Sequence, residues 1–292
     1  MSALGQSVVR PAPRSRRGAG VRRALRNRLS LAGVIVLSLI IVMVTFGPLV
    51  WTVSPTDQDL TNRLSGMTPL HPLGTDTLGR DVLSRILTGG RVSLSLAVSA
   101  VLASALIGGA IGLISGYFRG RVDSALMRLM EVILAFPALV LALAISAATG
   151  AGVFSTFIAV AVPGTPLYAR LVRSMVLSVR SREYVLAARA VGVPPPLLIL
   201  RHVVPNSVSP LVVQASLGVG FALQYIAALG YLGLGVQPPT PEWGAILNDS
   251  QTFLIQAPLV LVAPGLVIAL AILSFNLLGD ALRDLLDPVS TR

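Results

Sequence analysis

The sequence predicts an all-α, polytopic membrane protein with six transmembrane helices. Hydrophobic residues make up 54% of the 292 positions and charged residues 12%, and the mean hydropathy is +0.80. Soluble domains carry about 25% charged residues. Six apolar stretches reach the length of about 20 residues that a helix needs to cross the hydrocarbon layer. We place the spans at residues 30–51, 92–116, 126–148, 152–172, 207–232 and 256–278.

The arginines predict which side of the membrane each loop faces. All 23 basic residues are arginine, and basic loops remain in the cytoplasm. Arginines cluster in 10–28, 117–125 and 170–201, whereas the loop at 52–91 is charge-balanced and the loop at 233–255 is acidic. An even number of spans places both termini on one side, the cytoplasmic one. We therefore predict three regions, an Arg-rich cytoplasmic segment at 1–29, a transmembrane domain at 30–280 and a cytoplasmic tail at 281–292.

Composition also excludes several kinds of chemistry. A phosphate-binding P-loop needs a lysine after its glycines, and the chain has no lysine. Cysteine is absent and only two histidines are present, so we predict no metal site, no catalytic residue and no cofactor bound by this chain. The net charge of +11 arises from arginines beside apolar spans, which predicts contact with the lipid bilayer and no binding of nucleic acid.

The predicted spans are almost free of ionisable groups. Glu131, near the cytoplasmic end of the third span, is the closest exception, and we interpret it as an interfacial charge beside Arg128. Carriers driven by protons or sodium ions bury charged groups near the middle of the membrane. An ion-coupled secondary carrier is therefore a distant alternative.

Small residues recur every four positions in the second span. After Ala100 this stripe contains Ser104, Gly108, Gly112 and Gly116. Small side chains on one face allow two helices to approach closely, so we predict helix packing here, with lining of a transport path as the alternative. In the later spans, Pro137 and Pro163 each predict a kink, because proline removes a backbone donor.

The loop before the second span contains a short charged sequence, HPLGTDTLGRDVLSRILTGGRVSL, at 71–94. We predict a short helix capped by Thr75 or Asp76 and ended by Gly89-Gly90. Residues four apart on a helix are neighbours, which predicts the pairs Asp76–Arg80 and Asp81–Arg85. This helix either braces the outer surface or contacts a partner there. Its candidate residues are His71, Gly74, Asp76, Arg80, Asp81 and Arg85.

The segment at 180–206, which contains EYVLAARAVGVPPPLLILRHVVPN, predicts a cytoplasmic docking element. Residues 181–191 suit a short helix, Gly192 a left-handed stop, and the prolines at 194–196 the start of a second helix. Paired alanines leave a low surface that fits a groove on a partner; an amphipathic connection at the lipid surface is the alternative. The candidate residues are Glu183, Tyr184, Ala187, Ala188, Arg189, Gly192, Arg201, His202, Pro205 and Asn206.

The loop after the fifth span, LGYLGLGVQPPTPEWGAILNDS at 229–250, combines glycines and prolines. Such a run cannot continue a regular helix, so we predict a segment that folds back and is shielded by protein. It either lines an outer gate or forms a structural turn, and Trp243 suits a membrane interface. The candidate residues are Gly235, Gln237, Pro238, Pro239 and Trp243.

Three of these segments resemble the permease subunits of bacterial ABC importers. The family's cytoplasmic motif reads Glu-Ala-Ala, three residues, Gly, nine residues, Ile, one residue, Leu-Pro. This chain matches it at Ala187, Ala188, Gly192 and Pro205, with Val204 in place of leucine. It departs at Leu186, where the motif has glutamate, and at His202, where it has isoleucine. The segments at 71–94 and 229–250 are similar to those of the dipeptide/oligopeptide (peptide/nickel) branch.

The resemblance implies a type I importer permease fold in the bacterial inner membrane. The chain would form half of a pathway for di- or oligopeptides, beside a homologous permease. Two cytoplasmic ATPase subunits, which hold ATP and Mg²⁺, would bind the segment at 180–206, and a solute-binding protein would dock outside. Similar permeases import nickel chelates, haem or glutathione, so these remain alternative cargoes.

Overall fold

A computed structural model describes residues 28–199, 201 and 204–286, and within that part of the chain the regular elements are helices. The Arg-rich segment at 1–27, His202 and the last residues of the tail lie outside the described residues. The long helices are α2 (Arg28–Val50), α3 (Val82–Phe118), α4 (Gly120–Leu134), α5 (Ala138–Thr149), α6 (Val153–Arg180), α9 (Val204–Tyr231) and α11 (Pro258–Leu286). The short elements are η1 (Leu60–Asn62), α7 (Glu183–Ala190), α8 (Pro195–Leu198), α10 (Trp243–Ser250) and η3 (Gln251–Phe253).

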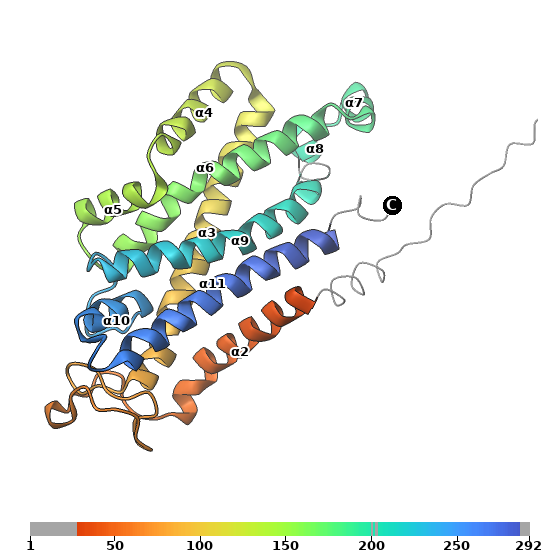
Figure 1. Cartoon of the computed structure of the whole chain (residues 1–292). Coiled ribbons are helices and arrows are strands. Elements are labelled where there is room, and N and C mark those ends of the chain that lie inside the picture. Colours follow the sequence, from red (N-terminus) through yellow and green to blue (C-terminus); the bar gives the residue numbers. More distant parts are fainter. Residues whose placement is uncertain (1–27, 200, 202–203, 287–292) are drawn as a thin grey trace, which may run out of the picture.

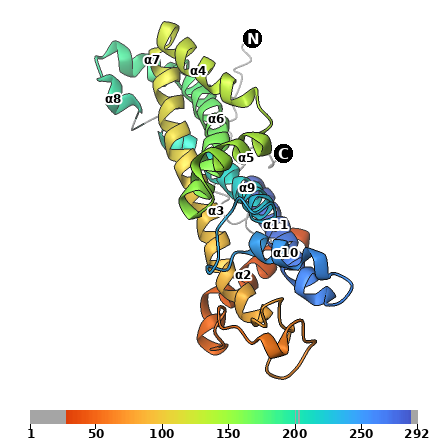
Figure 2. The same ribbon diagram turned by 90° about the vertical axis from the view of Figure 1, so that its left-hand side faces the viewer.

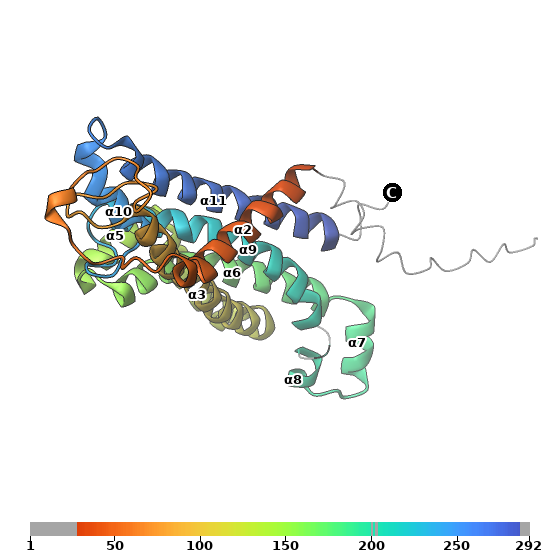
Figure 3. The ribbon, with the colours of Figure 1, turned by 90° about the horizontal axis from the view of Figure 1, so that it is seen from below.

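The helices form one elongated bundle with two different ends (Figure 1). Helix α11 lies between α2 and α9, and α3 packs mainly against α6, with further contacts to α9 and α2. At one end are α10 and the loop at 51–81, which we call the α10 end; α7 and α8 project from the other, which we call the α7 end (Figures 2 and 3).

The membrane character of the bundle is clear, although fewer helices pass a strict test than the six expected. Within the described residues, four are long and apolar enough to span a membrane, namely α2, α3, α9 and α11. The pair α4–α5 bends by 88° and counts as a fifth if it is one broken span. The break coincides with Pro137, which lies between α4 and α5, whereas Pro163 lies inside α6.

The prediction that the helix ends at Gly89-Gly90 is wrong. Both glycines lie inside α3, which begins at Val82, and both are buried. A Cβ at Gly90 would lie 2.5 Å from Val44 Cγ2 and 2.7 Å from Trp243 Cζ2. The two glycines are therefore contact points that let neighbouring elements approach the helix.

The stripe of small residues faces α6. A Cβ at Gly108 would lie 2.4 Å from Thr165 O, and one at Gly112 would lie 2.4 Å from Ala169 O. Ser104 continues the contact, since its Oγ lies 2.7 Å from Ala161 O. At Gly116 the added Cβ would meet the side chain of Val176 at 2.7 Å. The two helices thus approach each other backbone to backbone, which is the packing that small residues permit.

An arginine joins α2 to α3 at the α10 end of the bundle. Pro48 lies inside α2 and has no N–H to donate to the carbonyl four residues earlier, Val44 O. Arg91 Nε donates to that carbonyl at 2.9 Å, and Arg91 Nη2 donates to Thr45 O at 2.5 Å. The arginine therefore satisfies the backbone group that the proline leaves unpaired.

This contact predicts a specific rescue. Arg91→Leu leaves Val44 O without a donor and should lower the free energy of unfolding by about 1–3 kcal/mol, the usual cost of an unsatisfied buried polar group. Adding Pro48→Ala supplies an N–H within α2 and should recover most of this loss. Thermal unfolding of the purified variants in detergent measures both effects. If the double variant were no more stable than Arg91→Leu alone, the explanation would be wrong.

Candidate functional site

The segment between α6 and α9 forms two short helices, as the sequence suggests. Helix α7 ends at Ala190, and Gly192 follows with a φ of 81°, in the left-handed region. The N–H of Val193 donates to Ala188 O at 3.1 Å, which satisfies a carbonyl at the end of α7. Helix α8 begins at Pro195, where proline is compatible with a first helical turn.

This α7–α8 element is attached by a few buried side chains and exposes apolar ones. Val185 is 4% exposed and packs in a cluster with Val172, Val176 and Val179 of α6. Leu198 of α8 is also 4% exposed. By contrast, large apolar side chains are exposed at Tyr184, Leu186, Val191 and Leu197. Exposed apolar patches mark surfaces that contact a protein partner or the membrane.

The other predicted residues of this segment occupy different positions. Glu183 and Ala187 are exposed, Ala188 is half-buried, and Arg201 and Pro205 are exposed at the return to α9. The backbones of Arg189 and Asn206 lie in α7 and α9. His202 lies outside the described residues.

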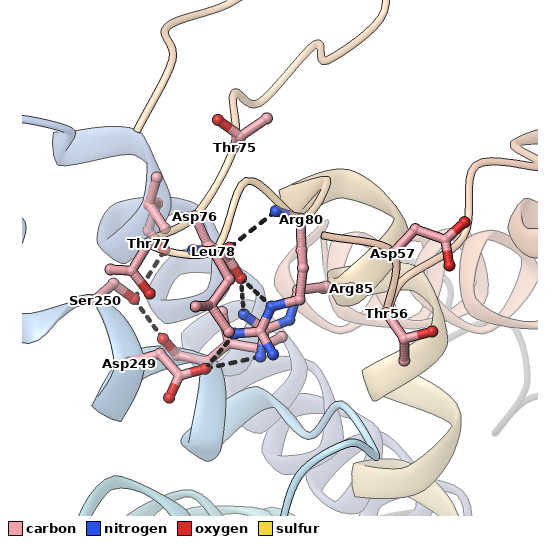
Figure 4. Close-up of polar contacts among 12 residues, drawn as sticks. Thr56, Asp57, Thr75, Asp76, Thr77, Leu78, Arg80, Arg85, Asp249 and Ser250 are labelled. Carbon is pink, nitrogen blue, oxygen red and sulfur yellow. Dashed lines mark hydrogen bonds and ion pairs between the residues drawn. The ribbon is translucent and has the colours of Figure 1, made fainter. Parts of the chain in front are cut away.

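At the α10 end, a cluster of four charged residues joins the loop before α3 and the start of α3 to α10, which is far away in sequence (Figure 4). Asp76 Oδ2 accepts from Arg80 Nε at 2.7 Å and from Arg85 Nη1. Arg80 Nη2 and Arg85 Nη2 each donate to Asp249 Oδ2 at 2.9 Å. Asp76, Arg80 and Arg85 are buried, and the side chain of Asp249 is 28% exposed. Two positive and two negative groups therefore balance within a largely buried network.

The predicted pair Asp76–Arg80 is confirmed, but the pair Asp81–Arg85 is wrong. Asp81, not Thr75 or Asp76, caps the helix here, because α3 begins at Val82 and Asp81 Oδ2 accepts from Ser84 N at 2.7 Å. Its extended backbone turns the carboxylate back over the first helical turn.

Asp81 also binds two aromatic side chains. Trp51 Nε1 donates to Asp81 Oδ2 at 2.8 Å, and His71 Nδ1 lies 3.0 Å from Asp81 Oδ1. The chain approaches itself closely nearby: Gly74 has a φ of 79°, and a Cβ there would lie 2.5 Å from Ser65 O. The loop at 51–81 is thus folded tightly onto the start of α3.

The second loop folds back as expected, but Trp243 is not at an interface. Trp243 is 1% exposed, and its Nε1 donates to Ile86 O at 2.9 Å. Gly235 also packs closely, since a Cβ there would lie 2.7 Å from Gly230 Cα. Gln237 Nε2 donates to Gly233 O and Gly235 O at 3.1 Å. The exposed Pro238 and Pro239 precede α10.

Glu242 is a buried acid that the sequence analysis did not select. It caps α10, accepting from Ala245 N at 3.0 Å, and accepts from Ser93 Oγ at 2.8 Å. Burial raises the pKa of Glu242, and the hydrogen bonds from Gly244, Ser93, Ala245 and Trp243 act in the opposite direction. The sequence signal was an acidic residue directly before the first residue of a short helix.

Two cavities lie farther along the bundle. A mostly apolar cavity of about 280 Å³ opens between α3, α6, α9 and the bend between α4 and α5. Its lining includes Ser104, Tyr168 and Tyr225, and no charged residue. A polar cavity of about 250 Å³ is lined by Glu131, Arg128 and the ion pair Arg173–Asp123, in which Arg173 Nε lies 2.6 Å from Asp123 Oδ1.

Comparison with known families identifies the chain. Residues 108–291, more than half of the sequence, match the family described as the binding-protein-dependent transport system inner membrane component. The chain belongs to this family. Residues 18–71 also match the N-terminal TM domain of oligopeptide transport permease C. The chain is therefore an ABC transporter permease, and not itself the ATPase.

Curated relatives of this permease are similar over most of their length. The dipeptide transport system permease protein DppC of Alkalihalophilus pseudofirmus is 42% identical over 90% of this chain and 86% of the relative. The di/tripeptide transport system permease protein DppC of Pseudomonas aeruginosa is 43% identical over 90% and 88%. The glutathione transport system permease protein GsiD of Pectobacterium atrosepticum is 40% identical over 91% and 89%.

Solved structures confirm the fold of the permease. An inward-facing form of the MetNI methionine ABC transporter matches with a TM-score of 0.57 and 17% identity, over 68% of this chain and 95% of that chain. An amino acid ABC transporter with histidines matches with a TM-score of 0.53 and 16% identity, over 67% and 91%.

Proposed function

We propose that this permease forms half of the pathway of an ATP-driven importer of short peptides in the bacterial inner membrane. The assignment of the cargo rests on the sequence identity of 40–43% between this chain and permeases named for dipeptides, di/tripeptides and glutathione. Dipeptides and oligopeptides are the first candidates. Glutathione, itself a tripeptide, is the second, because its permeases are similarly close.

The proposed topology has six crossings, with both termini in the cytoplasm. The first five are α2, α3, α4–α5, α9 and α11, and α6 supplies the sixth. Its 28 residues extend over about 42 Å at about 1.5 Å per residue, and its first half is apolar. Arg170, Arg173 and Arg180 lie in its second half, which favours a cytoplasmic position for the α7 end and an extracytoplasmic one for the α10 end.

The α7–α8 element is the proposed contact with a cytoplasmic ATPase. Its exposed apolar side chains need a partner, and the partner of a permease at this side of the membrane is the subunit that holds ATP and Mg²⁺. Two such ATPases would serve this chain and a homologous permease, and a solute-binding protein would deliver cargo at the α10 end. The apolar cavity between α3, α6 and α9 is the proposed part of the transport path in this chain. Because no charged residue lines it, it would not select cargo by charge.

Loss of the ATPase after a charge is placed in the α7–α8 element is the expected result. Ala188→Glu adds a carboxylate to the half-buried centre of α7, where docking would strip it of water. Each 1.4 kcal/mol of lost binding is tenfold in affinity, so we expect co-purification of the ATPase to fall by about tenfold or more. Gly192→Pro should act similarly, because proline cannot adopt the φ of 81° found there.

The matched control is Leu286→Glu, which likewise adds one acid, at the exposed end of α11 on the same side. All variants are compared at equal membrane levels after co-expression with the neighbouring genes. If the control lost as much ATPase as Ala188→Glu, or if Ala188→Glu retained the ATPase, the α7–α8 element would not be the docking site. If the wild type retained no ATPase, the importer proposal would fail. Uptake of labelled dipeptide and of labelled glutathione by the wild type then separates the two cargoes.

A further inference from the structure

A cavity of about 390 Å³ with both polar and apolar lining residues lies between the two loops of the α10 end. One wall comes from the loop before α3 and the other from the loop around α10. The lining residues are Thr56, Gln58, Thr77, Leu78, Arg80, Pro238, Pro239 and Asp249. Figure 4 shows Asp249 below the segment that contains Thr77 and Leu78, with Arg80 and Arg85 beside it and bonded to its carboxylate.

Only one of the two carboxylate oxygens of Asp249 accepts hydrogen bonds within the described residues. Arg80 and Arg85 both donate to Oδ2, and within the described residues no hydrogen bond is made to Oδ1. The side chain is 28% exposed, whereas that of Arg80 is 7% exposed and Arg85 4%. Arg80 also lines the cavity, but the more exposed of the two charged groups is the carboxylate of Asp249, whose Oδ1 keeps free acceptor capacity.

Exposed charges around the cavity are mostly negative. Asp57 and Asp59 lie on the adjoining loop and are exposed. Hydrogen bonds from Thr61 and Asn62 lower the pKa of Asp59, which keeps it ionised. Arg63, the one exposed arginine between positions 52 and 81, has its Nε engaged with Thr77 O at 2.7 Å. The approach to the cavity thus favours a cation.

We propose that this cavity is a docking pocket for a lysine or arginine side chain of the solute-binding protein. The inference rests on the proposed function, because it requires an importer with such a protein and an extracytoplasmic α10 end. The incoming cation would bind Asp249 Oδ1 and be flanked by the hydroxyls of Thr56 and Thr77. An acidic side chain fits less well, because the carboxylate of Asp249 is more exposed than the guanidinium groups of Arg80 and Arg85.

Gln58 offers a way to change the charge of the pocket without disturbing the fold. Its side chain is exposed, and in the described structure it makes no hydrogen bond. Charges at the rim of an interface mainly change the association rate and its dependence on salt. Gln58→Lys should repel the incoming cation and Gln58→Glu should attract it, so the two variants should act in opposite directions.

The experiment measures association of the purified solute-binding protein, encoded by the neighbouring gene, with the complete transporter in lipid nanodiscs. At low salt we expect Gln58→Lys to slow association by about threefold to tenfold and Gln58→Glu to accelerate it. Added salt should reduce both differences. Met67→Lys is the control, since Met67 is exposed on the same loop and does not line the cavity.

Four other outcomes overturn the inference. Faster association of Gln58→Lys would mean that the pocket receives an acid. Equal slowing by Gln58→Lys and Met67→Lys would mean that the effect is one of overall charge. No change in either Gln58 variant, with normal binding to the wild type, would exclude the pocket from the interface while leaving the importer intact. Absence of binding to the wild type would instead overturn the proposed function, and this inference with it.

Discussion

Asp76→Ala should destabilise the α10 end of the protein by about 3–5 kcal/mol, the usual cost of removing one partner from a buried ion pair. Asp76 is 1% exposed and accepts from both Arg80 and Arg85. Its Oδ1 also accepts from the N–H groups of Leu78 and Arg80 at 2.8 and 2.9 Å. Without this carboxylate, two buried guanidinium groups share Asp249 alone.

The measurement is the free energy of unfolding of the purified protein in detergent, with two comparison variants. Asp249→Ala removes a carboxylate that is 28% exposed, so water can replace it, and we expect a smaller loss of about 1–2 kcal/mol. Asp57→Ala removes an exposed carboxylate on the same loop and should change stability little. If Asp76→Ala and Asp249→Ala lost equal stability, burial would not be the cause.

Gly112→Ala and Gly109→Ala should have opposite effects on stability. The added Cβ at Gly112 would lie 2.4 Å from Ala169 O and 2.9 Å from Arg173 N, which are backbone atoms. Since backbone cannot rotate away, α6 has to move, and we expect a loss of about 1–3 kcal/mol. At Gly109 the nearest atom would be Val172 Cγ2, at 3.9 Å.

Gly109→Ala therefore meets ordinary contact, and the higher helix propensity of alanine should stabilise α3 by up to about 1 kcal/mol. Unfolding of the two variants in the same detergent, with transport of labelled dipeptide as a second measurement, tests the difference. Tolerance of alanine at Gly112 would mean that α3 and α6 are not in close contact in the membrane.

Features decided by neighbouring residues could be predicted from the sequence. The helix–glycine–helix form of 183–198 depends on a left-handed glycine and on prolines at a helix start, which are local properties. Likewise, the apolar length and the arginine pattern are local, and they indicated a helical membrane protein, whereas the permease family was indicated by the resemblance of three segments. The break at Pro137 follows from the missing N–H of proline, although its size of 88° does not.

The errors concern residues whose partners are distant in sequence. Arg85 binds Asp249, 164 positions away, so the spacing of four that suggested Asp81–Arg85 was misleading. Trp243 has the sequence pattern of an interfacial tryptophan, but it is buried beside α3, where Gly90 leaves room for its ring. Gly89-Gly90 resembles a helix end for the same reason, because a glycine that permits contact and one that ends a helix look alike in sequence.

The contact between α3 and α6 has a mechanical consequence. The backbones of α3 and α6 are in contact at Gly108 and Gly112, with no layer of flexible side chains between them at those points. The two helices should therefore move as one rigid unit. Helix α7 is attached to this pair of helices by Val185, which is buried against Val176 and Val179 of α6. A displacement of α7 should therefore be transmitted along α6 and α3 to the α10 end, with little of it absorbed by side-chain motion between the two helices.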